Sequence, residues 1–149
     1  MSEYRVAITG VANVQEAFEK IRLSALRECV DAVRITAKKI VVDAKTIAPV
    51  GTPESTGMPN YEISYAYMRS IRDTPLEITY DKRKIRAGVT AGGKIINPNT
   101  GRPVDYAVAL EFGRSRQAPN GVLTPSALKN ITYLVVEAKK AVVRGILSV

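Results

Sequence analysis

Residues 104–128 read VDYAVALEFGRSRQAPNGVLTPSAL. A short apolar segment ends at Gly113, a polar and basic segment follows, and a Thr-Pro pair then favours a new helix. The stretch therefore predicts a rigid element that is joined to a docked helix through an exposed turn. We expect Phe112 and Leu128, on either side of this turn, to lie in the core beneath it.

The segment after the turn has the clearest amphipathic pattern of the chain. We expect Thr124 to cap this helix and Pro125 to occupy its first position. Apolar residues then recur at intervals of three or four, the period of one helical face; they are Leu128, Ile131, Val135, Ala138, Val142 and Ile146.

The first fifty residues predict a strand and a long helix. Tyr4, Val6 and Ile8 occupy alternate positions, as in a half-buried strand. Asn13 is a good N-cap, and a helical pattern runs from it to Pro49, which ends it. A helix of about 34 residues measures roughly 50 Å, longer than a domain of this size is wide. We expect it to bend, break or overhang, and an overhanging end would be available to a neighbouring subunit.

A long loop follows the helix, at about residues 50–68. It combines Pro and Gly with Tyr61, Tyr65 and Tyr67 and shows no sustained period. Long loops in compact domains are usually functional or disordered, and tyrosines favour contact surfaces because they bury much area at a low entropy cost. We interpret the segment as a protruding contact loop; a flexible loop without a partner is the alternative.

Two alternating segments, 76–80 and 85–91, flank the polar residues 81–84 and predict a β-hairpin. The order of strand, long helix, loop, hairpin, short apolar segment and helix predicts an α+β fold. We expect a single domain over residues 1–149, with an antiparallel sheet packed against the N-terminal and C-terminal helices.

The composition argues against an enzyme. The 149 residues include no histidine, which excludes Ser-His and Cys-His nucleophiles and His-dependent metal sites. The single cysteine, Cys29, lies in an apolar helical pattern and is expected to be a small buried hydrophobe. No phosphate-binding glycine motif occurs, and no apolar run approaches the length of a membrane span. We therefore expect a soluble protein with no catalytic residue, metal or cofactor.

Two acidic residues could take part in chemistry, because Asp105 and Glu111 flank the short apolar segment. A carboxylate pair can serve acid–base catalysis or bind a divalent cation, but no third group supports either role. We instead expect Glu111 to orient the following turn through an ion pair or a backbone hydrogen bond, with Arg114 or Arg116 as possible partners.

The positive charge is concentrated at the C-terminal end. The net charge is +8, and residues 113–149 contribute six basic and one acidic residue, a net +5. Such a surface attracts nucleic acid or an acidic protein face. A basic DNA-binding module, using residues 82–86 at the hairpin tip and the C-terminal helix, is therefore the alternative function.

Several short motifs occur in a fixed order along the chain. They are Ala44-Lys45-Thr46-Ile47-Ala48-Pro49, Thr56-Gly57, Arg69-Ser70-Ile71, Ala87-Gly88-Val89, the segment 106–113 and Leu123-Thr124-Pro125-Ser126-Ala127-Leu128. In this order they resemble the neck and tail-completion family of long-tailed phages and prophages, of the minor tail protein Z type. The resemblance extends over most of the chain. It departs at residues 58–68, which the family usually lacks and which we interpret as an added contact arm.

The resemblance implies a non-enzymatic virion protein, made in the host cytoplasm, that forms a sixfold ring at the head–tail junction. Its partners would be further copies of itself and the adjacent connector and tail-tube proteins, with DNA passing without sequence-specific contact. Neither a cofactor nor a membrane is implied. We expect the partner contacts at Tyr61, Tyr65, Tyr67, Arg114, Arg116 and Asn120.

Overall fold

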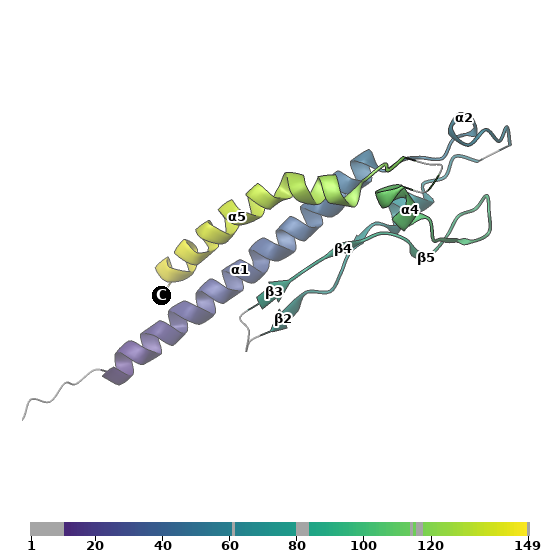
Figure 1. Cartoon of the computed structure of the whole chain (residues 1–149). Coiled ribbons are helices and arrows are strands. Elements are labelled where there is room, and N and C mark those ends of the chain that lie inside the picture. Colours follow the sequence, from purple (N-terminus) through teal and green to yellow (C-terminus); the bar gives the residue numbers. More distant parts are fainter. Residues whose placement is uncertain (1–10, 61, 80–83, 114, 116–117, 149) are drawn as a thin grey trace, which may run out of the picture.

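The computed structural model describes residues 11–60, 62–79, 84–113, 115 and 118–148. Figure 1 shows an elongated molecule built along one long helix, α1 (Val11–Ile47). The C-terminal helix, α5 (Leu123–Leu147), lies antiparallel beside α1, and a β-hairpin lies on the other side of α1 (Figure 1). The predicted α+β class is confirmed.

The long N-terminal helix is continuous. It ends at Ile47, two residues before Pro49, as expected from the missing N–H of proline. It begins at Val11, so Asn13 lies inside the helix and the prediction that Asn13 caps it is wrong. The predicted strand at residues 4–8 lies outside the described residues.

Helices α1 and α5 pack through small side chains. The buried residues of α5 are Ser126, Asn130, Ala141 and Gly145. A Cβ added to Gly145 would lie 2.5 Å from the Ala25 backbone nitrogen, so the two backbones touch where these residues cross. Small residues permit this close approach, and they place the larger side chains of α5 on its other faces.

The hydrophobic core lies at the end of α1 where α5 begins. It consists of the buried residues Ala44, Ala48, Ala66, Tyr67, Ile71, Val104 and Val122. The predicted core residues Phe112 and Leu128 are not part of it, because they are 72% and 64% exposed. That prediction is wrong: the helical faces that carry these two side chains turn away from the rest of the subunit.

The strands form three two-stranded antiparallel ladders within the described part of the chain. β2 (Glu77–Thr79) pairs with β3 (Lys84–Arg86), which confirms the predicted hairpin. β1 (Arg72–Asp73) pairs with β4 (Val89–Thr90), and β5 (Gly93–Ile96) pairs with β6 (Pro103–Val104). The predicted strand at 85–91 is therefore divided between two ladders.

The division of that strand occurs at Gly88. The backbone N–H of Gly88 donates to the Thr74 hydroxyl at 2.8 Å, and the backbone N–H of Thr74 donates to the Gly88 carbonyl, also at 2.8 Å. A Cβ on residue 88 would lie 3.1 Å from the Thr74 hydroxyl oxygen, so glycine suits this close approach.

The loop predicted at about 50–68 is tied into local structure. It contains α2 (Pro53–Thr56), which Thr52 and Ser55 cap reciprocally, and α3 (Ala66–Ser70) begins before its predicted end. A bridge joins Gly51 to Ser64. Figure 1 shows this segment projecting at the end of the molecule opposite the free end of α1.

Candidate functional site: assembly surfaces

The junction between α4 (Ala107–Phe112) and α5 is organised by Glu111. Its carboxylate accepts hydrogen bonds from three successive backbone N–H groups, those of Val122 at 2.8 Å, Leu123 at 3.0 Å and Thr124 at 2.6 Å. These groups belong to the first turn of α5, where backbone N–H groups have no partner within the helix. Glu111 therefore caps α5 from outside the helix.

This arrangement corrects the predicted helix start. The N-cap residue of α5 is Val122, which makes no side-chain cap hydrogen bond, and the helix begins at Leu123. Thr124 and Pro125 thus lie inside the first turn. The predicted backbone hydrogen bond of Glu111 is confirmed, while its possible partners Arg114 and Arg116 lie outside the described residues.

The Glu111 side chain is held in its ionised form. Burial alone would raise its pKa, but hydrogen bonds from the Thr124 side chain and from the backbone N–H groups of α5 prevail and lower the pKa. A carboxylate is also favoured at a helix N-terminus by the helix dipole. The carboxylate thus acts as a hydrogen-bond acceptor for the start of α5. Its lowered pKa differs from the raised pKa that is expected of a general acid.

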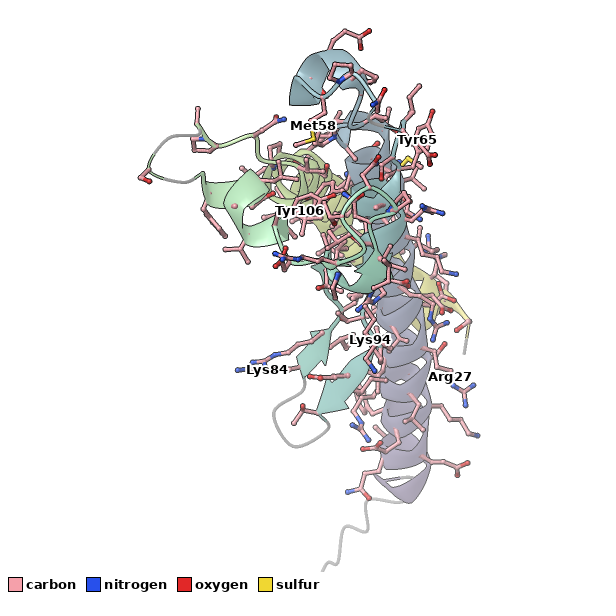
Figure 2. All side chains as sticks on the ribbon, turned by 90° about the vertical axis from the view of Figure 1, so that its right-hand side faces the viewer. Arg27, Met58, Tyr65, Lys84, Lys94 and Tyr106 are labelled. Atoms are coloured by element: carbon pink, nitrogen blue, oxygen red, sulfur yellow. The ribbon has the colours of Figure 1, made fainter. Side chains whose placement is uncertain are left out.

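The tyrosines of the long loop have different surroundings. Tyr65 is 47% exposed, and Figure 2 shows it near the projecting end of the molecule. Tyr67 is only 3% exposed and its ring lies 6.1 Å from that of Tyr106. Tyr67 is therefore a core residue, and its prediction as a surface contact is corrected. Tyr61 lies outside the described residues.

The hydroxyl of Tyr67 has no hydrogen-bond partner among the described residues. Burial, with smaller contributions from the charges of Glu111 and Tyr106, raises the pKa of Tyr67 to about 12. The hydroxyl therefore stays protonated, in keeping with a residue of the core.

The predicted contact Asn120 lies in the exposed segment that joins α4 to α5. Its backbone N–H donates to the Leu110 carbonyl at 2.7 Å. Of the six predicted contact residues, the structure thus leaves Tyr65 and Asn120 exposed and buries Tyr67; Tyr61, Arg114 and Arg116 lie in the undescribed part of the chain.

An extended apolar surface follows α5. We call it the α5 stripe, and it consists of Leu128, Ile131, Val135, Val142 and Ile146, all of which are exposed. The periodicity identified these residues as one helical face, but α5 uses another face to pack on α1. The stripe is consequently a surface of the subunit.

The second apolar surface is the free end of α1. The hydroxyl of Ser24 pairs with that of Ser148, just beyond the last turn of α5, so the α1 residues before Ser24 extend past the partner helix. Figure 1 shows this overhang beyond the C-terminus. We call residues 14–23 the α1 arm; it carries Phe18, which is 67% exposed, and Val14, which is 54% exposed. Of the three expected outcomes, a bend, a break or an overhang, the structure shows the overhang.

Two of the hollows that border α1 are lined mainly by apolar side chains. One has a volume of about 260 Å³ and lies against the β2–β3 hairpin, between Leu26 and Cys29 on α1 and Ile78 and Ile85 on the strands. Burial, and to a lesser extent the charge of Glu28, raises the pKa of Cys29, so this thiol is less often the reactive thiolate. The other hollow, about 310 Å³, lies between α1, β4 and the start of α5.

Basic residues of α5 are engaged within the subunit. Lys129 pairs with Asp43 at 3.3 Å, Lys140 with Glu137 at 2.9 Å and Arg144 with Glu28 at 2.8 Å. On the hairpin, Lys84 and Arg86 are exposed, and Figure 2 shows Lys84 pointing away from the molecule. Residues 82 and 83 lie outside the described part of the hairpin.

Among the residues that the structure describes, no group of three or more Cys, Asp or Glu side chains is placed to hold a metal ion. None of the described helices combines the length and the apolar character that crossing a bilayer requires.

Comparison with protein-family models, with curated proteins and with solved structures finds no match for this chain.

The sequence interpretation missed the role of the small residues. Ala25 on α1 and Ala141 and Gly145 on α5 occupy helical positions where the backbones must come close, a signal of the packing face that the larger apolar residues obscured. The α5 stripe and the α1 arm are apolar surfaces that the packing of α1 on α5 does not bury. They are the strongest candidates for contacts with other molecules.

Proposed function

We propose that this protein is a structural subunit of a protein assembly, and specifically a ring subunit at the head–tail junction of a long-tailed phage. The observation that carries the assembly role is the exposure of large apolar side chains along α1 and α5. Phe18, Leu128 and Leu147 are 67%, 64% and 79% exposed. A subunit with such side chains on its surface is suited to burying them against other subunits.

The character of that surface supports the same role. Both phenylalanines of the chain are largely exposed, and so are most of the large apolar residues of α5. Monomeric soluble proteins rarely expose contiguous apolar patches of this extent, and larger patches mark interaction sites. The location at a head–tail junction is supported by the ordered sequence motifs that resemble the neck and tail-completion family.

DNA binding is the second candidate, favoured by the +8 net charge and by the exposed Lys84 and Arg86. Against it, three basic residues of α5 form ion pairs within the subunit. Phosphate contacts release counterions, so DNA affinity falls steeply with salt. Titration of the purified protein with duplex DNA should show only weak binding at physiological salt; tight, strongly salt-dependent binding would favour the second candidate.

The gene can be deleted from the phage or prophage that carries it to test the location. Electron micrographs of the resulting lysate should show DNA-filled heads and tail components that fail to join, or tails of uncontrolled length, and an intact copy in trans should restore joined particles. Fully tailed, infectious particles from the deletion would reject the assignment.

A further inference from the structure

The α1 arm has an amphipathic surface that the described part of its own subunit does not cover. Val14, Phe18 and Ile21 are spaced four and three residues apart, so they share one face of the helix. Val14 and Phe18 are exposed, and Leu23 lies on the opposite face. Because α5 ends beside Ser24, Phe18 lies beyond the reach of the α5 in its own chain.

The α5 stripe is a complementary surface. It runs from Leu128 to Ile146, which corresponds to about 27 Å of helix. The arm is a shorter helix that exposes an aromatic residue. A protruding helix with an aromatic anchor, set against a long aliphatic face, is the arrangement of helix-in-groove recognition.

Charge distinguishes the arm from other helices that could cover the stripe. Within the arm, Glu16 pairs with Lys20 at 2.8 Å and Glu19 with Arg22 at 2.8 Å, so its net charge is zero. α5 carries four basic residues, but Lys129, Lys140 and Arg144 form ion pairs within the subunit, so the stripe presents Lys139. Pairing two α5 stripes would therefore place two Lys139 side chains on one interface, whereas the arm adds no net charge.

One basic residue of α5 is also placed to meet the arm. Lys139 lies on the same helical face as Val135 and Val142, within the stripe, and is exposed. Of the two carboxylates of the arm, Glu19 follows Phe18 and lies at the edge of the Phe18 face, whereas Glu16 is seven residues before Leu23 and shares the opposite face. Lys139 is therefore placed to meet Glu19 when the arm docks on the stripe.

We propose that the α1 arm of one subunit docks on the α5 stripe of a second copy of the chain, with Phe18 as the central apolar anchor. The inference deepens the proposed function and rests on its assembly part. The two surfaces differ, so the contact is heterologous, which generates a ring when the rotation between neighbours closes. Each subunit gives one arm and receives another.

Both contacts can form on one subunit at the same time. The arm lies at the free end of α1 and the stripe lies on α5, whereas α2 projects at the opposite end of the molecule (Figure 1). The loop end of the molecule therefore stays open to other neighbours.

Sedimentation velocity over a range of protein concentrations tests the proposal, with circular dichroism as a check that each variant is folded. The wild type should form assemblies. Phe18→Ser in the arm and Val135→Ser in the stripe should each weaken association at least about tenfold, as loss of a central anchor does. The matched controls are Leu23→Ser, on the opposite face of the arm, and Val136→Ser, off the stripe; both should assemble like the wild type.

Mixing the two variants separates the proposed contact from a symmetric one. The Phe18→Ser protein keeps an intact stripe and the Val135→Ser protein keeps an intact arm, so a mixture should form one-to-one pairs that grow no further. Association of the Phe18→Ser protein at wild-type strength, or a mixture that remains monomeric, would overturn the proposal.

The sedimentation experiment tests arm docking independently of the proposed location at the head–tail junction. A wild-type protein that is monomeric at every concentration overturns arm docking, while the gene deletion still tests the head–tail location. Conversely, arm-dependent assembly of the purified protein stands even if the deletion yields normal particles.

Discussion

The carboxylate of Glu111 connects two helices through three hydrogen bonds. Glu111 lies in α4, and its carboxylate caps α5. Loss of the carboxylate would leave three backbone N–H groups at the start of α5 without this partner. We expect Glu111→Ala to lower the free energy of unfolding by about 1 to 3 kcal/mol, the range for hydrogen bonds to a charged group. Glu111→Gln should cost about 1 kcal/mol, because the amide oxygen still accepts.

The free energy of unfolding is measured by urea denaturation, followed by circular dichroism. The pH dependence of this free energy gives a second test of the Glu111 cap. The pKa of Glu111 in the folded protein lies below its usual value of 4.5. Its stabilising effect is therefore fully present above that value and is lost as the pH falls through the folded pKa. The difference between wild type and Glu111→Gln should shrink in acid, whereas a constant difference would argue against the cap. Glu16→Gln, on an exposed pair, is the control and should change little.

Individual apolar side chains differ in what they contribute to the isolated subunit. Ile71 is 1% exposed and belongs to the core. We expect Ile71→Ala to destabilise the protein by about 2 to 5 kcal/mol through lost burial and a cavity. Leu128→Ala and Phe112→Ala should change the stability of the monomer by less than about 0.5 kcal/mol, as exposed substitutions do. Denaturation of dilute samples measures all three, and a large cost at Leu128 would contradict its exposed position.

At the scale of elements, the crossing of α1 and α5 depends on Gly145. Alanine is the better helix former by about 1 kcal/mol, so a helix in isolation would gain from Gly145→Ala. In this protein the added Cβ would overlap the Ala25 backbone, and relief requires the helices to separate. We expect a net loss of about 1 to 3 kcal/mol, as in overpacked cores.

Val143→Ala, on an exposed position of the same helix, is the control for that substitution and should leave thermal denaturation nearly unchanged. A Gly145→Ala protein as stable as the wild type would show that the backbones do not touch at this crossing.

The sequence was sufficient to predict elements whose signals are local. The C-terminal helix, the hairpin around residues 80–83 and the end of α1 before Pro49 depend on periodicity and turn residues, and the structure has them. The face that each helix buries could not be predicted in this way. Periodicity identifies an apolar face but not its partner, and α5 packs on α1 through Ser126, Asn130, Ala141 and Gly145 instead.

The candidate site was predictable in part for the same reason. Helix length predicted that α1 bends, breaks or overhangs, and the structure shows the overhang. The place of Glu111 before the turn predicted an ion pair or a backbone hydrogen bond, and the structure shows backbone hydrogen bonds. The burial of Tyr67 depends on packing against Tyr106, which lies 39 residues further along the chain. No local pattern within the loop distinguishes Tyr67 from Tyr65.

At the scale of the whole molecule, the core is small for the length of the chain. The largest fully buried side chains are Ile71, Val104 and Val122, all at one end. Association that involves only the folded state stabilises that state by mass action. We therefore expect the midpoint of thermal unfolding to rise when the protein concentration is raised about a hundredfold. Differential scanning fluorimetry measures it, and the Phe18→Ser protein should show a smaller rise.

The closure of the segment between α4 and α5 has a practical consequence for engineering. Leu110 and Glu111 lie in α4, just before the segment, and they bind its far end through Asn120 and the first turn of α5. The length of the chain between Gly113 and Asn120 therefore has little influence on where α5 lies. Each doubling of a flexible loop costs only about 0.6 kcal/mol, so a peptide tag inserted after Ser115 should leave the melting temperature nearly unchanged. Such a tag would mark each subunit within a larger particle for antibody labelling in electron micrographs.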